Sequence, residues 1–121
     1  MTDQIRAIAE MRLRPGVDAE TALACVRRIS ARSESLDPGT LAHNYYYDPV
    51  RGLLIAHEHY ADAAAMVAHL GNMDPADIGV LVGSFEIASM RLFGRPSDEL
   101  RGMLAGFGTA EYFDFVGGFT R

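Results

Sequence analysis

The sequence predicts an α+β protein whose strands and helices follow the ferredoxin-like split βαβ order, with an antiparallel sheet and helices on one of its faces. Three observations support this fold class. A length of 121 residues with 49% hydrophobic and 22% charged residues suits one globular domain with its own core. Segments with strand alternation and segments with helical spacing follow in the order strand, helix, strand, strand, helix, strand. Proline and glycine turn signals separate these segments.

Residues 5–13 predict the first strand, because apolar and polar residues alternate along them. We expect the more apolar face of this strand to point toward the helices, and that face carries Ile5, Ala7, Ala9, Met11 and Leu13. An amphipathic helix of about 17 residues follows. It begins after Asp18, a typical N-cap, and Asp-Pro-Gly at 37–39 ends it.

Residues 40–48 and 53–60 predict a hairpin, because both are rich in strand-forming residues and the loop between them contains proline and glycine. A second helix is expected from about 61 to 71, and a further short helix over 74–82. Residues 84–93 predict the fourth strand. The ferredoxin-like part is therefore expected to span residues 1–93.

The last quarter of the chain predicts one more helix and one more strand. Ser97 is a typical N-cap, and the acidic residues after it suit the first turn of a helix that runs to about Ala105. A short strand is expected over 110–116. We expect this C-terminal helix–strand extension, residues 94–121, to pack on the same domain.

Composition excludes several classes of chemistry. All 11 basic residues are arginine, so no lysine is present to form a Schiff base or a Walker-type phosphate site. The net charge of −5 argues against nucleic-acid binding. No apolar run approaches the roughly 18 residues that span a bilayer, and the N-terminus lacks the apolar segment of a secretory signal. The single cysteine, Cys25, excludes an internal disulfide and predicts a buried thiol. We therefore expect a cytoplasmic protein with no nucleic-acid or membrane partner.

Both faces of the predicted sheet carry apolar residues. In the fourth strand the two faces carry Phe85 and Ile87 against Ala88, Met90 and Leu92. Helices can cover only one face of a split βαβ sheet, and a monomer rarely leaves a large apolar face exposed. A twofold partner is the usual solution, so the pattern predicts a homodimer.

Short motifs follow one another in a fixed order along the second and third strands and the second helix. A glycine opens the second strand, a glutamate ends the third, an aromatic residue lies two positions later, an aspartate starts the next helix, and Ala-His-Leu lies inside that helix. Here they are Gly39, Glu58, Tyr60, Asp62 and Ala68-His69-Leu70. Over about residues 5–93 this order and spacing resemble the antibiotic biosynthesis monooxygenase family of dimeric α/β barrels.

The resemblance implies a dimeric α/β barrel that binds small aromatic molecules. Members of that family include cofactor-independent oxygenases that convert phenols to quinones. The sequence departs from the family pattern at Tyr60, where tryptophan is usual, and at His43, where an aromatic residue is common. Because the chain has no tryptophan, the haem-degrading activity of some relatives is not expected. Residues 94–121 extend beyond the usual end of the family's domain.

Four histidines are candidates for chemistry. His57 and His59 share one face of the third strand. If paired residues of the hairpin sum to 100, His43 lies opposite His57, and the three imidazoles form a cluster that could bind zinc or act as bases. The alternative is a polar stripe on a solvated or interface face, and a shift of one residue in register removes the cluster. We expect no bound metal.

Glu58 faces away from His57 and His59, among apolar neighbours. It is either a general base with a raised pKa or one half of an ion pair with an arginine such as Arg12 or Arg91. His69 lies in the second helix and either lines a pocket, where it could take a phenolic proton, or faces solvent.

The sequence thus leads to one main hypothesis. We expect a cofactor-independent monooxygenase that acts on a small phenolic or polyketide-like molecule, needs no cofactor, and uses His69 or Glu58 as the base. The residues expected to bind the substrate are His43, Tyr45, Tyr60 and Met66. One alternative is a non-catalytic small-molecule-binding or structural dimer of the same fold. The other is a metal-dependent enzyme that uses His43, His57 and His59.

Overall fold

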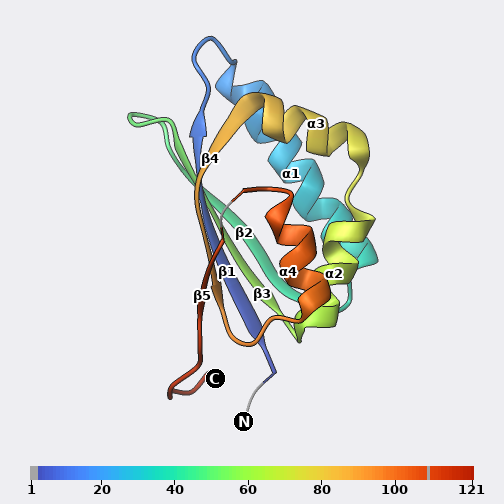
Figure 1. Cartoon of the computed structure of the whole chain (residues 1–121). Coiled ribbons are helices and arrows are strands. Elements are labelled where there is room, and N and C mark those ends of the chain that lie inside the picture. The colour runs from blue at the N-terminus through green and yellow to red at the C-terminus, as the bar shows by residue number, and fades with distance from the viewer. Residues whose placement is uncertain (1–2, 109) are drawn as a thin grey trace.

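Within the described residues, 3–108 and 110–121, five strands form one sheet in the order β2-β3-β1-β4-β5. In this computed structural model all four helices lie on one face of the sheet (Figure 1). The strands are β1 (Ile5–Leu13), β2 (Thr40–Asp48), β3 (Leu53–Tyr60), β4 (Phe85–Phe93) and β5 (Glu111–Phe113). The helices are α1 (Ala19–Leu36), α2 (Ala63–Asn72), α3 (Pro75–Ser84) and α4 (Asp98–Ala105). This architecture confirms the predicted ferredoxin-like α+β class with a C-terminal helix–strand extension.

Each helix begins with a side-chain cap. Asp18, Asp62, Asp74 and Ser97 each accept a hydrogen bond from a backbone N–H of the first turn. The caps predicted at Asp18 and Ser97 are confirmed. The predicted last strand is too long, because only Glu111–Phe113 pair with β4, in parallel. None of the helices in the described part of the chain is long and apolar enough to cross a membrane.

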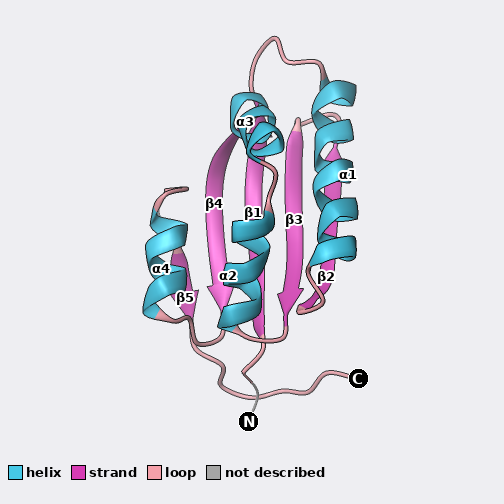
Figure 2. Ribbon diagram, turned by 90° about the vertical axis from the view of Figure 1, so that its right-hand side faces the viewer, coloured by secondary structure: helices cyan, strands magenta, loops and turns pink. Residues whose placement is uncertain are grey.

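The apolar face of β1 points toward the helices, as its alternation predicts. Ile5, Ala7, Ala9 and Met11 are all buried. They divide between two core clusters, one shared mainly with α1 and the other with α2 and α4. Figure 2 shows these helices in front of the sheet. The extension contributes Leu100 and Leu104 to the second cluster.

The two-sided pattern of β4 has a different cause from the one predicted. β4 pairs with β1 through Met11↔Ile87 and then through Ala9↔Met90, so one extra residue of β4 lies between these pairs. Such a bulge reverses the alternation along a strand. Phe85, Ile87, Met90 and Leu92 therefore all lie on the face that the helices cover. The inference that Met90 and Leu92 lie on the face opposite Phe85 and Ile87 is wrong.

The opposite face of the sheet is not covered by any helix of the described residues (Figure 1). It is mixed in character: Arg6, Ile8 and Glu10 of β1 lie beside His59, His57 and Ile55 of β3. We refer to it as the open face.

Candidate active site

A cavity of about 60 Å³ lies between the covered face of the sheet and helices α2, α3 and α4. Most of its wall is apolar. The four polar side chains that line it are His43, Tyr45, Glu58 and His69. The cavity thus combines an apolar enclosure with a small convergent polar group, which is typical of a small-molecule site.

His43 and Glu58 meet because the β2–β3 hairpin pairs them directly. His43 Nε2 lies 3.3 Å from Glu58 Oε1, and the two side chains are 6% and 14% exposed. The other ring nitrogen of His43, Nδ1, lies 2.9 Å from Ser30 Oγ on α1. The hydroxyl of Tyr60 donates a hydrogen bond to the same oxygen of Glu58. Three strand residues thus form one buried polar cluster.

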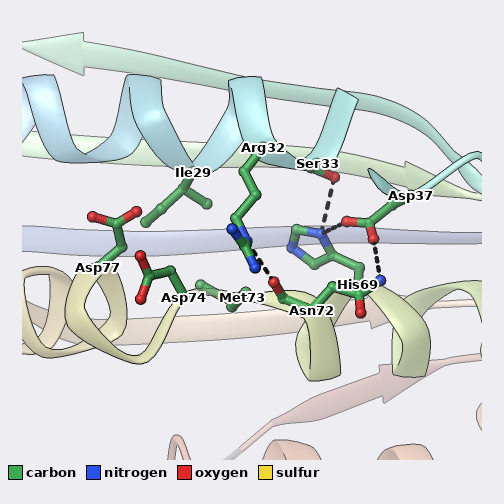
Figure 3. A pocket seen from close by; sticks show the side chains of 9 residues that line it. All are labelled: Ile29, Arg32, Ser33, Asp37, His69, Asn72, Met73, Asp74 and Asp77. Carbon is green, nitrogen blue, oxygen red and sulfur yellow. Dashed lines mark hydrogen bonds and ion pairs between the residues drawn. The ribbon is translucent and has the colours of Figure 1, made fainter. Parts of the chain in front are cut away.

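His69 forms a second pair, with Asp37. The Nδ1 atom of His69 lies 2.9 Å from Asp37 Oδ2 and 3.0 Å from Ser33 Oγ, and both His69 and Asp37 are buried. The side-chain amide of Asn72 donates to the other Asp37 oxygen at 2.7 Å (Figure 3). An ionised carboxylate can only accept a hydrogen bond, so the Asp37 carboxylate favours the tautomer of neutral His69 whose proton is on Nδ1 and donates to it. The Nε2 atom is then the basic nitrogen.

The two pairs are in contact. The ring centroids of His43 and His69 are 4.8 Å apart, and those of Tyr60 and His69 are 5.6 Å apart. His69 also borders a small polar hollow of about 10 Å³ between α1, α2 and α3, on the side away from the sheet (Figure 3). His69 thus lies between the apolar cavity and the polar outer surface, where Arg32 donates to the Asn72 carbonyl at 2.7 Å.

Both carboxylates of the site are held in the ionised form. Burial acts to raise the pKa of Glu58, but the hydrogen bond and charge of His43 and the Tyr60 hydroxyl outweigh it, so this pKa lies below its ordinary value. Burial also acts against ionised Asp37, and the hydrogen bonds from Asn72, His69 and Ser33 lower its pKa. Burial and the nearby Glu58 charge raise the pKa of Tyr45 and Tyr60. These tyrosines therefore remain protonated at neutral pH.

Five of the six predicted site residues line the cavity: His43, Tyr45, Glu58, Met66 and His69. The sixth, Tyr60, is fully buried and does not line the cavity, but its hydroxyl donates to Glu58 and its ring lies 5.6 Å from the ring of His69.

The predicted cluster of three histidines does not form. In the central part of the hairpin, paired residues sum to 101, so Asn44 lies opposite His57, and His43 lies opposite Glu58. His57 and His59 consequently lie on the open face, where His59 Nε2 is 2.8 Å from Gln4 Oε1.

The partner of Glu58 within the chain is His43, not an arginine. Arg12 pairs in register with Leu53 on the open face, and the Nε atom of Arg91 lies 3.6 Å from Glu111 Oε1. Neither arginine is therefore on the cavity side of the sheet.

Sequence reasoning missed Asp37, Ser30 and Ser33. Asp37 lies 32 positions before His69, and its Asp-Pro-Gly context indicates a helix end rather than a site. The one available signal was that Asp37 precedes the glycine that opens β2. A carboxylate at the end of α1 is thereby brought close to the end of α2.

No protein-family profile matches the sequence, and no curated protein does. Solved structures do match. MupZ from Pseudomonas fluorescens is 20% identical, with a TM-score of 0.83 over 99% of this chain and 96% of its own. That alignment therefore includes nearly all of the C-terminal extension.

Two further structures match a smaller part of the chain. A proposed antibiotic biosynthesis monooxygenase from Caulobacter crescentus is 18% identical, with a TM-score of 0.65 over 79% of this chain and 92% of its own. A variant of SnoaB, a cofactor-independent oxygenase from Streptomyces nogalater, is 14% identical, with a TM-score of 0.62 over 79% of this chain and 96% of its own. At these identities the similarity shows the fold, which the chain shares with structures of the antibiotic biosynthesis monooxygenase type.

Proposed function

We propose that this chain, which has the fold of antibiotic biosynthesis monooxygenase-type proteins, is a cofactor-independent monooxygenase that oxidises a small phenolic or polyketide-like molecule. The observation that carries the proposal is the Asp37–His69 pair at the wall of an otherwise apolar cavity. A buried carboxylate that orients a histidine is a recurrent arrangement for a general base. The similarity of fold to a cofactor-independent oxygenase adds support.

In the first step, His69 Nε2 takes the phenolic proton of the bound substrate. Asp37 stabilises the imidazolium that forms, since its carboxylate lies 2.9 Å from the protonated Nδ1. The apolar wall leaves the phenolate poorly solvated, and its electron density is therefore available for reaction.

In the second step, the phenolate reduces dioxygen, and a carbon–oxygen bond forms at a ring carbon that bears hydrogen. The product is a hydroperoxide in the keto form. The peroxide anion takes the proton held on His69 to become this hydroperoxide. Neutral His69 then removes the ring proton and passes it to the hydroxide that leaves as the O–O bond breaks, which gives water. One phenol and one dioxygen give one quinone and one water, so no external reductant is required.

The size of the cavity sets a condition on the substrate. A cavity of roughly 150 Å³ accommodates benzene. The cavity here measures about 60 Å³, so side chains must move before an aromatic ring enters. Met11, Met66, Met73 and Met90 line it, and unbranched methionine side chains adapt readily to a ligand. His43, Tyr45 and Met66 contact the ring in this proposal, and Tyr60 orients Glu58.

We further propose that the functional unit is a cytoplasmic homodimer. Ile8, Leu53 and Ile55 are apolar residues of the open face, and no helix of the described chain covers them. A second copy that packs on this face would bury them.

Oxygen uptake tests the activity. Chelator-treated protein is mixed with a panel of mono- and polycyclic phenols under labelled dioxygen, and the product is analysed by mass spectrometry. The proposal expects one labelled oxygen atom in the quinone and the other in water, and a loss of activity in His69→Ala. His57→Ala is the matched control, because its ring lies on the opposite face of the sheet from the cavity, and sedimentation checks that this variant keeps the assembly state of the wild type. Phenol binding without oxygen uptake would instead indicate a non-catalytic binding protein.

A further inference from the structure

Three potential metal ligands converge at the cavity wall. His43 on β2, Glu58 on β3 and His69 on α2 each offer one ligand atom, and these atoms lie within 4.8 Å of one another. Two imidazole nitrogens and one carboxylate oxygen suit zinc and other first-row transition metals, whereas magnesium and calcium prefer oxygen ligands alone. This set differs from the histidine trio considered from the sequence.

The outer partners of these ligands are also present. Histidines that bind metals usually engage their second ring nitrogen with a carboxylate or another polar group, which fixes the ring. Nδ1 of His69 lies 2.9 Å from Asp37 Oδ2, and Nδ1 of His43 lies 2.9 Å from Ser30 Oγ. Nε2 of His69 is therefore available to a metal, and Nε2 of His43 lies 3.3 Å from Glu58 Oε1, so these two atoms already face the position that a shared ion would take. The Tyr60 hydroxyl in turn orients the Glu58 carboxylate.

The spacing requires only small movements. Zinc binds nitrogen and carboxylate oxygen at roughly 2.0–2.2 Å, so tetrahedral ligand atoms lie about 3.5 Å apart. His43 Nε2 and Glu58 Oε1 are already 3.3 Å apart, and all three ligand atoms lie within 4.8 Å of one another, so the largest separation has to shorten by about 1 Å. The cavity would leave the fourth coordination position open to water or a ligand.

We propose that His43, Glu58 and His69 form a binding site for a divalent transition-metal ion, represented by Zn²⁺. The inference rests on the geometry and not on the proposed oxygenase activity. If the enzyme acts without a cofactor, the bound ion occupies the lone pair of His69 Nε2 and the Glu58 carboxylate. Zn²⁺ is then an inhibitor that competes with proton transfer.

Calorimetric titration of the untagged full-length chain with Zn²⁺ tests the site. We expect saturable binding of one ion per chain that is lost in His43→Ala, Glu58→Gln and His69→Ala. His57→Ala and His59→Ala are matched controls that each remove an imidazole from the open face, and binding should be unchanged in both. Circular dichroism of each variant confirms that it is folded.

If a substitution of one of the three ligands prevents folding, the Asp37→Asn variant still tests the proposed metal site. Asp37→Asn leaves all three ligands in place and should weaken Zn²⁺ binding about 10-fold or more, because it removes the outer partner of His69. Affinity should also fall as the pH drops, since both imidazoles must be deprotonated. Co²⁺ used in place of Zn²⁺ should give the visible absorption of a tetrahedral site.

Two results would overturn the inference: the absence of Zn²⁺ binding in the folded protein, or binding that survives loss of His69 and disappears in His57→Ala. Neither result affects the oxygenase proposal. Conversely, turnover that is abolished by a chelator and restored by metal would support the site and refute cofactor independence.

Discussion

Replacing Asp37 with asparagine isolates the contribution of one buried charge to the proposed base. The substitution keeps the size of the side chain and removes its negative charge. In the wild type, the carboxylate lies 2.9 Å from His69 Nδ1, which places the two charge centres of the imidazolium–carboxylate pair about 4 Å apart. At an effective dielectric constant of about 20, that attraction is worth about 4 kcal/mol. Each 1.4 kcal/mol changes a rate about tenfold, so the full loss corresponds to roughly 10³-fold.

We therefore expect Asp37→Asn to lower kcat by about 10²- to 10³-fold. The effect can be smaller than the full 10³-fold because Ser33 remains as a hydrogen-bond partner of His69. KM should change little, because Asp37 does not line the apolar cavity. The assay is the initial rate of oxygen uptake with a saturating phenol. Asp77→Asn is the control, since it removes the same charge from the same outer hollow without touching His69. A kcat within a few-fold of wild type in Asp37→Asn would refute the role of the pair.

Three further outcomes are expected. Sedimentation at micromolar concentration should give twice the 13.2 kDa mass of the chain, and a single monomeric species would contradict the dimer. The pKa of Glu58 in the folded protein lies below its ordinary value of 4.5. Ionised Glu58 therefore stabilises the fold fully above pH 4.5, and this stabilisation is lost as the pH falls toward the lowered pKa. Chemical denaturation should therefore show stability decreasing below about pH 5, with a shallower decrease in Glu58→Gln; equal slopes would contradict this account. Gly39→Ala should lower the free energy of unfolding by about 1–3 kcal/mol, because the added Cβ would lie 2.6 Å from the Cβ of Ala65. Gly71→Ala is the control and should not destabilise the protein, because its added Cβ meets no atom within 4 Å. Equal melting temperatures of the two variants would contradict the close approach at Gly39.

The sequence predicted the order of the elements because the signals are local. Alternation along β1 identified its buried face, and the caps at Asp18 and Ser97 located two helix starts. Glu58 was correctly placed on the face opposite His57 for the same reason. Each of these inferences needs only the residues of one segment.

Inferences that depended on pairing between segments were less reliable. The hairpin register differs by one from the register that would have brought His43 beside His57, because the turn pairs Asp48 with Leu53 and this register continues to His43↔Glu58. The bulge of β4 likewise depends on its pairing with β1. The propensities of the individual residues predict neither the hairpin register nor the bulge in β4.

The Asp37–His69 pair lay beyond sequence reasoning for a further reason. It joins the ends of α1 and α2, whose proximity follows only from the packing of both helices on the sheet. Gly39 makes that approach possible, because its backbone lies against Ala65 at the start of α2 with no space for a side chain. The sequence shows the glycine at position 39, but its contact with Ala65 follows only from the three-dimensional structure.

Anaerobic absorption spectroscopy tests the central claim, removal of a phenolic proton by His69, most directly. Without dioxygen the reaction stops at the first step, so a bound phenol should remain as its phenolate. Wild-type protein is expected to produce the phenolate band at a pH below the pKa of the free phenol, and His57→Ala should do the same. His69→Ala should bind the phenol in its neutral form. A neutral phenol bound to wild type, or an equal phenolate band in His69→Ala, would contradict the account.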